Sequence, residues 1–178
     1  SVHGLASGEA VVSWMYDEDR GFSLGAWRLP IVPAAIINDL GMGGTKEWGD
    51  SPDYSALARA ACENAGLDFT LGNVGAGVGA SAGHLKAGLG SASVVNEDGL
   101  QVAALVVTNP FGAAVMPGTG ALWSWAMEQG GEMGGQHPPC ATPDLEVELS
   151  LEGRSGENTT LAVVATNAAL NKAQLKRM

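Results

Sequence analysis

Basic residues are scarce in this chain of 178 residues: nine Lys and Arg stand against 19 Asp and Glu, a formal net charge of −10 at pH 7. Nucleic-acid backbones and anionic membrane surfaces attract positively charged proteins, so this balance argues against both as partners. Long apolar runs are also missing, because no stretch approaches the roughly 18 residues that cross a bilayer. We therefore expect no nucleic acid and no membrane among the partners, whereas a cationic amine substrate is compatible with the charge.

Cysteine is nearly absent, with only Cys62 and Cys140, which are far apart and form no Cys-x-x-Cys pair. A reduced, cytoplasmic protein is the simplest expectation, although a single disulfide stays open. Metal sites need several His, Cys or carboxylate ligands at regular spacing. His137 and Cys140 stand alone in this respect, so the sequence predicts no metal.

Glycine, in contrast, is abundant at 26 residues, and 46% of the residues are hydrophobic. A chain of this length and composition folds as one domain, residues 1–178, and is not disordered. The glycine-dense segment 71–83 contains Gly-x-Gly-x-x-Ala twice, from Gly75 and from Gly77, which resembles a dinucleotide-binding turn. Such a turn must open a long helix, but more glycines interrupt the residues after it. We therefore predict a loop whose backbone N–H groups face a small polar group, as in an oxyanion hole.

The spacing of apolar residues predicts a mixture of helices and strands. Helices are expected over residues 5–19, 54–65 and 172–178, the last two capped by Asp53 and Asn171. Alternation or apolar runs predict strands over residues 34–37, 86–95, 100–108, 122–127, 144–151 and 161–166, with Asp98-Gly99 as a hairpin turn. The strand over 122–127 would place Trp123 and Trp125 on one face, as core packing or as an apolar wall for a hydrocarbon substrate.

Asn158 and Thr159 stand where a polar loop meets the last of these strands. A self-cleaving enzyme with an N-terminal nucleophile has this arrangement: the Thr159 hydroxyl attacks the Asn158 carbonyl, the acyl group shifts from nitrogen to oxygen, and water releases Thr159 as a new chain start. Its α-amine, which titrates about one pH unit above neutral, could then act as base for its own hydroxyl. The same residues also fit a plain loop leading into a core strand, or an Asn-x-Thr glycosylation sequon.

Ordered segments along nearly the whole chain resemble the DmpA-like peptidase family of N-terminal-nucleophile hydrolases: residues 30–41, 72–80 (Gly-Asn-Val-Gly-Ala-Gly-Val-Gly-Ala), 86–93 (Lys-Ala-Gly-Leu-Gly-Ser-Ala-Ser), 107–112 (Val-Thr-Asn-Pro-Phe-Gly), 158–166 and 171–174. The Asn-Thr junction, and the Trp-x-Trp segment followed by Glu-Met-Gly-Gly at 132–135, look most like the nylon hydrolase branch of the family. Enzymes of that branch cut 6-aminohexanoate oligomers, the amides of nylon-6.

The resemblance implies a fold of the α/β class, an αββα sandwich of the kind also found in ornithine acetyltransferases. It implies a precursor that cleaves itself into an α part, residues 1–158, and a β part that begins with residues 159–178, with the processed units assembled as a tetramer and with no cofactor. By matching segments, Thr159 is the nucleophile and Asn158 the residue in front of it. Lys86 and Asn109 match the family's active-site Lys and Asn, and Tyr54 is a weaker match to an active-site Tyr.

Family members have further strands before the equivalent of Ser1, and after the equivalent of Met178 they continue into a strand with an acidic pair that hydrogen-bonds the nucleophile's amine. We therefore expect this chain to be an internal part of a longer enzyme. The function implied is hydrolysis of linear amides such as 6-aminohexanoate oligomers through an acyl-enzyme. Three alternatives remain: an aminopeptidase or D-amino-acid amidase-esterase, an acyltransferase of the ornithine acetyltransferase kind, and an inactive fragment or assembly subunit.

Overall fold

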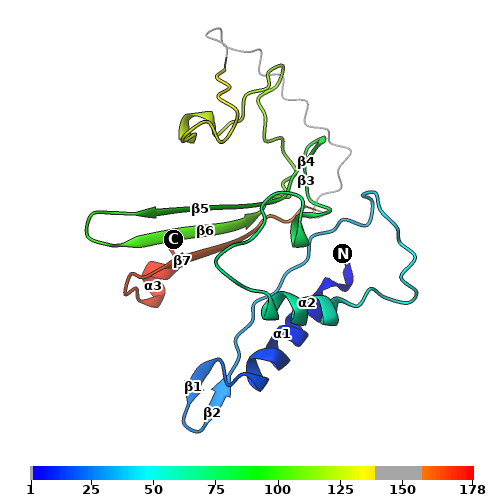
Figure 1. Cartoon of the computed structure of the whole chain (residues 1–178), viewed down its shortest axis with the longest axis vertical. Coiled ribbons are helices and arrows are strands. Elements are labelled where there is room, and N and C mark those ends of the chain that lie inside the picture. The colour runs from blue at the N-terminus through cyan, green and yellow to red at the C-terminus, as the bar shows by residue number, and fades with distance from the viewer. Residues whose placement is uncertain (1, 139–157) are drawn as a thin grey trace.

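The longest strands form a three-stranded antiparallel sheet with the order β5-β6-β7 (Figure 1). The computed structural model describes residues 2–138 and 158–178, and the strands are β5 (Leu89–Val95), β6 (Gln101–Val107) and β7 (Leu161–Thr166). Val107 lies opposite both Leu89 of β5 and Leu161 of β7, so the start of β5, the end of β6 and the start of β7 meet at one end of the sheet. The strands predicted over 86–95, 100–108 and 161–166 are thereby confirmed, with shifts at their ends.

The hairpin between β5 and β6 turns at Asp98-Gly99, as predicted. Gly99 has a φ of +80°, a left-handed conformation that suits glycine. The Asn96 side-chain oxygen accepts hydrogen bonds from the N–H groups of Asp98 (3.0 Å) and Leu100 (2.8 Å). This turn fixes the register of β6, and with it the position of the residues that follow Val107 at the opposite end of the sheet.

The glycine-rich segment forms a compact turn beside the start of β5. It contains a short 3₁₀ turn, η2 (Gly75–Gly77), and leads into the two-residue strands β3 (Ser81–Ala82) and β4 (Leu85–Lys86), which pair antiparallel. Ala or any larger residue at Gly77 would bring its Cβ to 2.8 Å from the Gly72 carbonyl oxygen, so the backbones touch here. The segment opens no long helix, which agrees with the rejection of a dinucleotide-binding turn.

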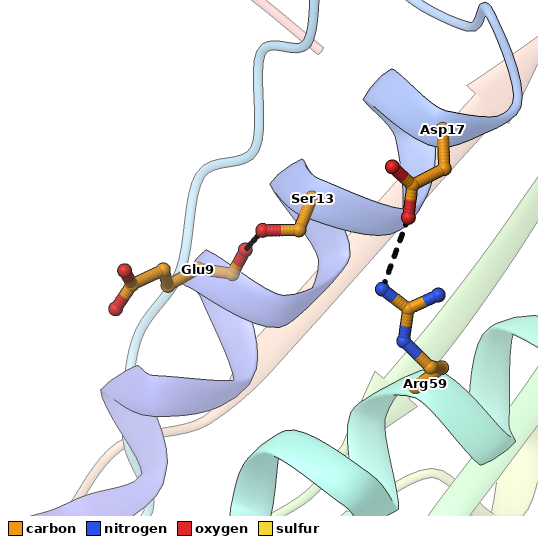
Figure 2. A network of polar contacts seen from close by, with 4 residues as sticks. All are labelled: Glu9, Ser13, Asp17 and Arg59. Atoms are coloured by element: carbon orange, nitrogen blue, oxygen red, sulfur yellow. Dashed lines mark hydrogen bonds and ion pairs between the residues drawn. The ribbon is translucent and has the colours of Figure 1, made fainter.

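Two helices pack against each other on one side of the chain (Figures 1 and 2). They are α1 (Ala6–Asp17), which follows the 3₁₀ turn η1 (Val2–Leu5), and α2 (Tyr54–Glu63), whose N-cap Asp53 accepts a hydrogen bond from the Ala56 N–H at 2.9 Å. The Arg59 guanidinium contacts the Asp17 carboxylate at 3.1 Å and ties the two helices together. A small hairpin, β1 (Phe22–Leu24) and β2 (Trp27–Leu29), follows α1.

The buried core lies where the glycine-rich segment meets the end of β6. Ile37, Ala80 and Val107 form its centre, with Ala87, Leu89 and Leu161 packed against them. Further along β7, Val163 and Val164 are 65% and 49% exposed. Successive strand residues point to opposite faces, so both faces of the sheet are exposed at this point. Burial in the described residues is thus concentrated at the end of the sheet that carries Asn109.

Two predicted strands are wrong. Residues 34–37 form no strand, and Ile37 is buried as part of an irregular segment; Pro30 and Pro33 just before it have no N–H to donate to a ladder. Residues 122–127 also form no strand: Leu122 makes an isolated bridge with Val115, and the 3₁₀ turn η3 (Trp125–Met127) follows. The strand predicted over 144–151 lies outside the described residues.

The helices agree better with the predictions, but their details differ. Leu57 of α2 is 62% exposed, whereas its neighbour Ala58 is buried. The last helix, α3 (Lys172–Leu175), is shorter than predicted, although its Asn171 cap is confirmed by a capping box with Gln174. Helices and small antiparallel sheets together agree with the α/β class. In the described part of the chain, no helix has the length and apolar character to span a membrane.

Candidate active site

The junction between Asn158 and Thr159 lies against the end of β6. Continuing the register beyond Val107–Leu161 places Asn109 opposite Thr159 and Pro110 opposite Asn158. Pro110 has no N–H group, so the regular ladder cannot continue past it. Side chains make the contacts instead: the Asn158 amide donates to the Pro110 carbonyl at 3.0 Å, and the Asn109 backbone N–H donates to the Thr160 hydroxyl oxygen at 3.1 Å.

Thr159 is therefore held from both sides. Its two neighbours are hydrogen-bonded to two consecutive residues, Asn109 and Pro110. Thr159 is half-buried, and its hydroxyl makes no hydrogen bond within residues 2–138 and 158–178. These bonds thus fix the backbone on both sides of the threonine, and no described residue occupies its hydroxyl.

Asn109 is buried, with 3% of its surface exposed, and is the one polar residue in the described ranges that is buried to this degree. Buried polar groups in proteins are almost always hydrogen-bonded. The side-chain oxygen of Asn109 accepts a bond from the Ser81 backbone N–H at 3.0 Å. A carboxamide has one acceptor end and one donor end, so this bond sets the orientation of the group. The NH₂ end makes no hydrogen bond to any of the described residues.

Lys86 is connected to Asn109 through Ser81, and these residues together with Thr159 and Thr160 form the cluster at the end of β6. Ser81 of β3 lies opposite Lys86 of β4, so one residue pairs with the lysine and donates to Asn109. The N–H of Thr108 donates to the Gly88 carbonyl at 3.0 Å, which joins the segment after Lys86 to the end of β6. The Lys86 side chain itself is exposed.

The glycine-rich segment supports this cluster differently from the prediction. The N–H groups of Val74, Gly77, Val78 and Ala80 donate to carbonyls within the segment. Within the segment, the N–H that faces a polar side chain is that of Ser81, which donates to the Asn109 carboxamide oxygen.

Asn73 holds the segment together, a role that the sequence analysis missed. Its side-chain NH₂ donates to the carbonyls of Gly77 (3.1 Å), Val78 (3.0 Å) and Ala87 (3.4 Å). Ala87 directly follows Lys86, so Asn73 anchors the backbone beside the lysine. An Asn inside a glycine-dense segment is the sequence signal that could have indicated it, because Asn side chains readily bond nearby backbone groups.

Tyr54 and the two tryptophans lie elsewhere. Tyr54 begins α2, and its carbonyl accepts a bond from the Ser7 hydroxyl of α1 at 3.5 Å. In the described part of the chain, Tyr54 makes no hydrogen bond to the Thr159 cluster. Trp123 is 48% exposed, and Trp125 meets the His137 ring edge-on at 5.4 Å. The predicted arrangement of both rings on one strand face is wrong, because no strand forms there.

Some predicted positions lie outside the described residues. They include Cys140 and most of the polar loop before Asn158.

A threonine hydroxyl can act as a nucleophile and a carboxamide NH₂ can stabilise an oxyanion, so Thr159 and Asn109 are groups of the kinds that cleavage of an amide bond requires. The chain belongs to peptidase family S58, whose model matches residues 1–178. The resemblance to DmpA-like peptidases is thereby confirmed.

Mycobacterial proteins are among the relatives. The chain is 37% identical over 181 residues to an uncharacterized aminopeptidase of Mycobacterium tuberculosis (strain ATCC 25618 / H37Rv) and to one of Mycobacterium bovis. It is 36% identical over 183 residues to an uncharacterized aminopeptidase of Mycobacterium leprae. These alignments cover 100% of this chain and 51% or 49% of the relatives, so the chain spans about half the length of the curated relatives it matches.

Proposed function

We propose that Thr159 is the nucleophile of an amidohydrolase and becomes a chain terminus when the Asn158–Thr159 bond is cut. The α part then comprises residues 1–158, and the β part begins at residue 159. The observation that carries this proposal is the pair of hydrogen bonds on either side of Thr159, from Asn158 to Pro110 (3.0 Å) and from Asn109 to Thr160 (3.1 Å). They hold the bond to be cut while the Thr159 hydroxyl stays unpaired among the described residues.

Self-cleavage follows the chemistry of an acyl shift. The Thr159 hydroxyl oxygen attacks the Asn158 carbonyl carbon, the C–N bond breaks, and the nitrogen takes the proton that the hydroxyl gave up. Water hydrolyses the resulting ester between the Asn158 carbonyl and the Thr159 oxygen, which separates the two pieces and restores the Thr159 hydroxyl beside the amine that the shift has freed. In turnover that amine accepts the hydroxyl proton, the oxygen attacks the substrate amide, and the proton passes to the leaving amine. Water then hydrolyses the acyl-enzyme.

Asn109 and Lys86 supply the electrostatic part of the mechanism. Because Ser81 occupies the oxygen of the Asn109 carboxamide, its NH₂ group is the end that can donate to an oxyanion. The Lys86 ammonium, paired in register with Ser81, adds positive charge on the same side of the cluster. Neither role requires a cofactor.

For the substrate we propose linear amides with a short chain between charged ends, with 6-aminohexanoate oligomers as the first choice. Trp123 and Trp125 are candidate apolar contacts for the methylene chain, and Tyr54 is a candidate contact for substrate. The second candidate is aminopeptidase activity, favoured by the names of the mycobacterial relatives. We further propose an αββα sandwich, a tetramer of processed units and a cytoplasmic location.

The experiment is an intact-mass measurement on the full-length protein with Thr159→Ala as the variant and Thr159→Ser as its matched control. We expect two pieces separated between Asn158 and Thr159 in the parent, slower cleavage in Thr159→Ser, and neither cleavage nor amide hydrolysis in Thr159→Ala. A fully active Thr159→Ala protein would show that the nucleophile is a different residue.

A substrate panel then separates the candidate activities. It compares 6-aminohexanoate dimer and trimer with amino-acid p-nitroanilides, each with a free or an acetylated amine. Preference for the oligomers supports the first choice, and strict dependence on a free α-amine supports the aminopeptidase. Transfer of the acyl group to an added amine, without hydrolysis, would identify an acyltransferase. If no amide reacts, the protein is an inactive assembly subunit.

A further inference from the structure

We infer that Thr160, the residue after the proposed nucleophile, is a positioning residue that keeps Thr159 in place both for self-cleavage and for turnover. Asn158 does the same for self-cleavage alone. This inference rests on the proposed function, because it concerns the same threonine. The two hydrogen bonds that flank the bond to be cut thus have different roles: that of Asn158 acts before cleavage only, and that of Thr160 acts before and after it.

The geometry gives the Thr160 hydroxyl a specific task. The Asn109 backbone N–H belongs to a residue that is 3% exposed, so it needs an acceptor inside the protein. The sheet cannot provide one in the usual way, because the β6–β7 ladder ends at Val107 and Leu161. The Thr160 hydroxyl oxygen accepts this bond at 3.1 Å and so extends the attachment of the two chains beyond the last ladder pair.

This bond connects the nucleophile to its proposed oxyanion donor. Asn109 is held at its side chain by the Ser81 N–H (3.0 Å) and at its backbone by Thr160 (3.1 Å). Thr159 is one covalent step from Thr160. A shift of Thr160 would therefore change the distance between the Thr159 hydroxyl and the Asn109 carboxamide, on which the rate depends steeply.

Cleavage separates the two arms of this arrangement. Before the cut, Asn158 bonded to Pro110 and Thr160 bonded to Asn109 hold the chain on both sides of the peptide bond. Afterwards Asn158 is the last residue of the α part, and its bond no longer restrains Thr159. Thr160 stays covalently attached to Thr159, so its bond alone continues to position the new terminus.

The test uses the full-length protein with Thr160→Val, which keeps the shape of the side chain and removes the acceptor, and Thr160→Ser, which keeps the acceptor. Thr166→Val is the matched control, because Thr166 lies at the other end of β7, where its hydroxyl donates to the Gln101 carbonyl (2.7 Å) and accepts from the Ala168 N–H (3.1 Å). Asn158→Ala completes the set. Self-cleavage is followed by intact mass over time, and kcat and KM are measured on fully processed protein.

We expect Thr160→Val to slow self-cleavage and to lower kcat by about ten- to a hundred-fold, with KM changed less than about three-fold. Thr160→Ser should restore both rates to within a few-fold of the parent. Thr166→Val should keep both rates even if it unfolds at lower temperature, and Asn158→Ala should slow cleavage and leave kcat of processed protein unchanged. If Thr160→Val gives no folded protein, Thr160→Ala, which lets water reach the Asn109 N–H, takes its place with the same expected effects.

Two results would overturn the inference: a Thr160→Val protein with the kinetics of Thr166→Val, or a Thr160→Ser protein as impaired as Thr160→Val. Thr159→Ala, measured alongside, separates this failure from failure of the proposed function. If Thr159→Ala is inactive while Thr160→Val behaves like the parent, only the role of Thr160 is wrong. If Thr159→Ala keeps full activity, the proposed nucleophile itself is wrong.

Discussion

Replacement of Asn109 by Ala separates the structural from the chemical contribution of this buried residue. The substitution removes the oxygen that accepts from the Ser81 N–H at 3.0 Å and the NH₂ group proposed to stabilise the oxyanion. The backbone N–H of residue 109, which donates to Thr160, is retained. Asn167→Ala is the matched control, because the Asn167 oxygen likewise accepts a backbone N–H, that of Gln101 at 2.9 Å, at the far end of the sheet.

The two contributions differ in size. An unsatisfied N–H at Ser81 should cost about 1–3 kcal/mol of folding stability. Removal of one oxyanion donor typically lowers kcat by about 10²–10³-fold, or about 2.7–4 kcal/mol in the transition state. Asn167→Ala should show a stability loss of similar or smaller size with unchanged kcat. A stability loss alone lowers the amount of folded enzyme, so it cannot produce a large drop in kcat of the folded fraction.

The assay combines urea unfolding with active-site-normalised kinetics on processed protein. We expect Asn109→Ala to fold at the assay temperature, to process slowly and to turn over at about 1% of the parent rate or less. The reasoning is refuted if the kcat of folded and processed Asn109→Ala lies within about three-fold of the kcat of Asn167→Ala, because loss of an oxyanion donor lowers kcat by far more than this.

Two further predictions concern the scaffold. Gly88→Ala would place its Cβ against the Gly72 carbonyl and should destabilise the protein by about 1–3 kcal/mol or more, whereas Gly90→Ala meets nothing within 4 Å and should be neutral within about 1 kcal/mol. Urea unfolding compares them, and equal losses would contradict the close backbone approach. Asp17→Ala breaks a contact between side chains that are 57% and 45% exposed, so the loss should be below about 1 kcal/mol and shrink further in high salt. A larger loss that survives in 1 M salt, where the Debye length is roughly 3 Å, would show that Asp17 acts through packing.

Local sequence features predicted the elements that depend on local physics. The Asp98-Gly99 turn and the Asp53 cap need only neighbouring residues, and the structure has both. The strand after Thr160 also forms, because β6 provides its ladder partner. The strand over 122–127 failed because alternation alone does not form a strand. A ladder partner is needed, and Leu122 finds only the single bridge to Val115.

The cluster at Asn109 shows what sequence could not supply. The match to a family indicated Asn109, Lys86 and Thr159, but no local pattern indicates that the N–H of Ser81 meets an amide 28 positions further along the chain. The three carbonyls bonded by Asn73 are likewise fixed by the folding of the glycine-rich segment. Such contacts depend on tertiary packing, for which a single sequence carries little information.

The two bonds beside Thr159 also connect distant parts of the chain, 48 positions apart for Asn158 and Pro110 and 51 for Thr160 and Asn109. Contacts between such separated residues form late, because the entropy of closing the intervening chain must be overcome first. The proposed cut therefore cannot occur on a nascent chain before β7 has joined β6. The rate at which the two cleaved pieces appear therefore sets a lower limit on the rate at which β7 pairs with β6. Mass spectrometry can measure this rate without any spectroscopic probe.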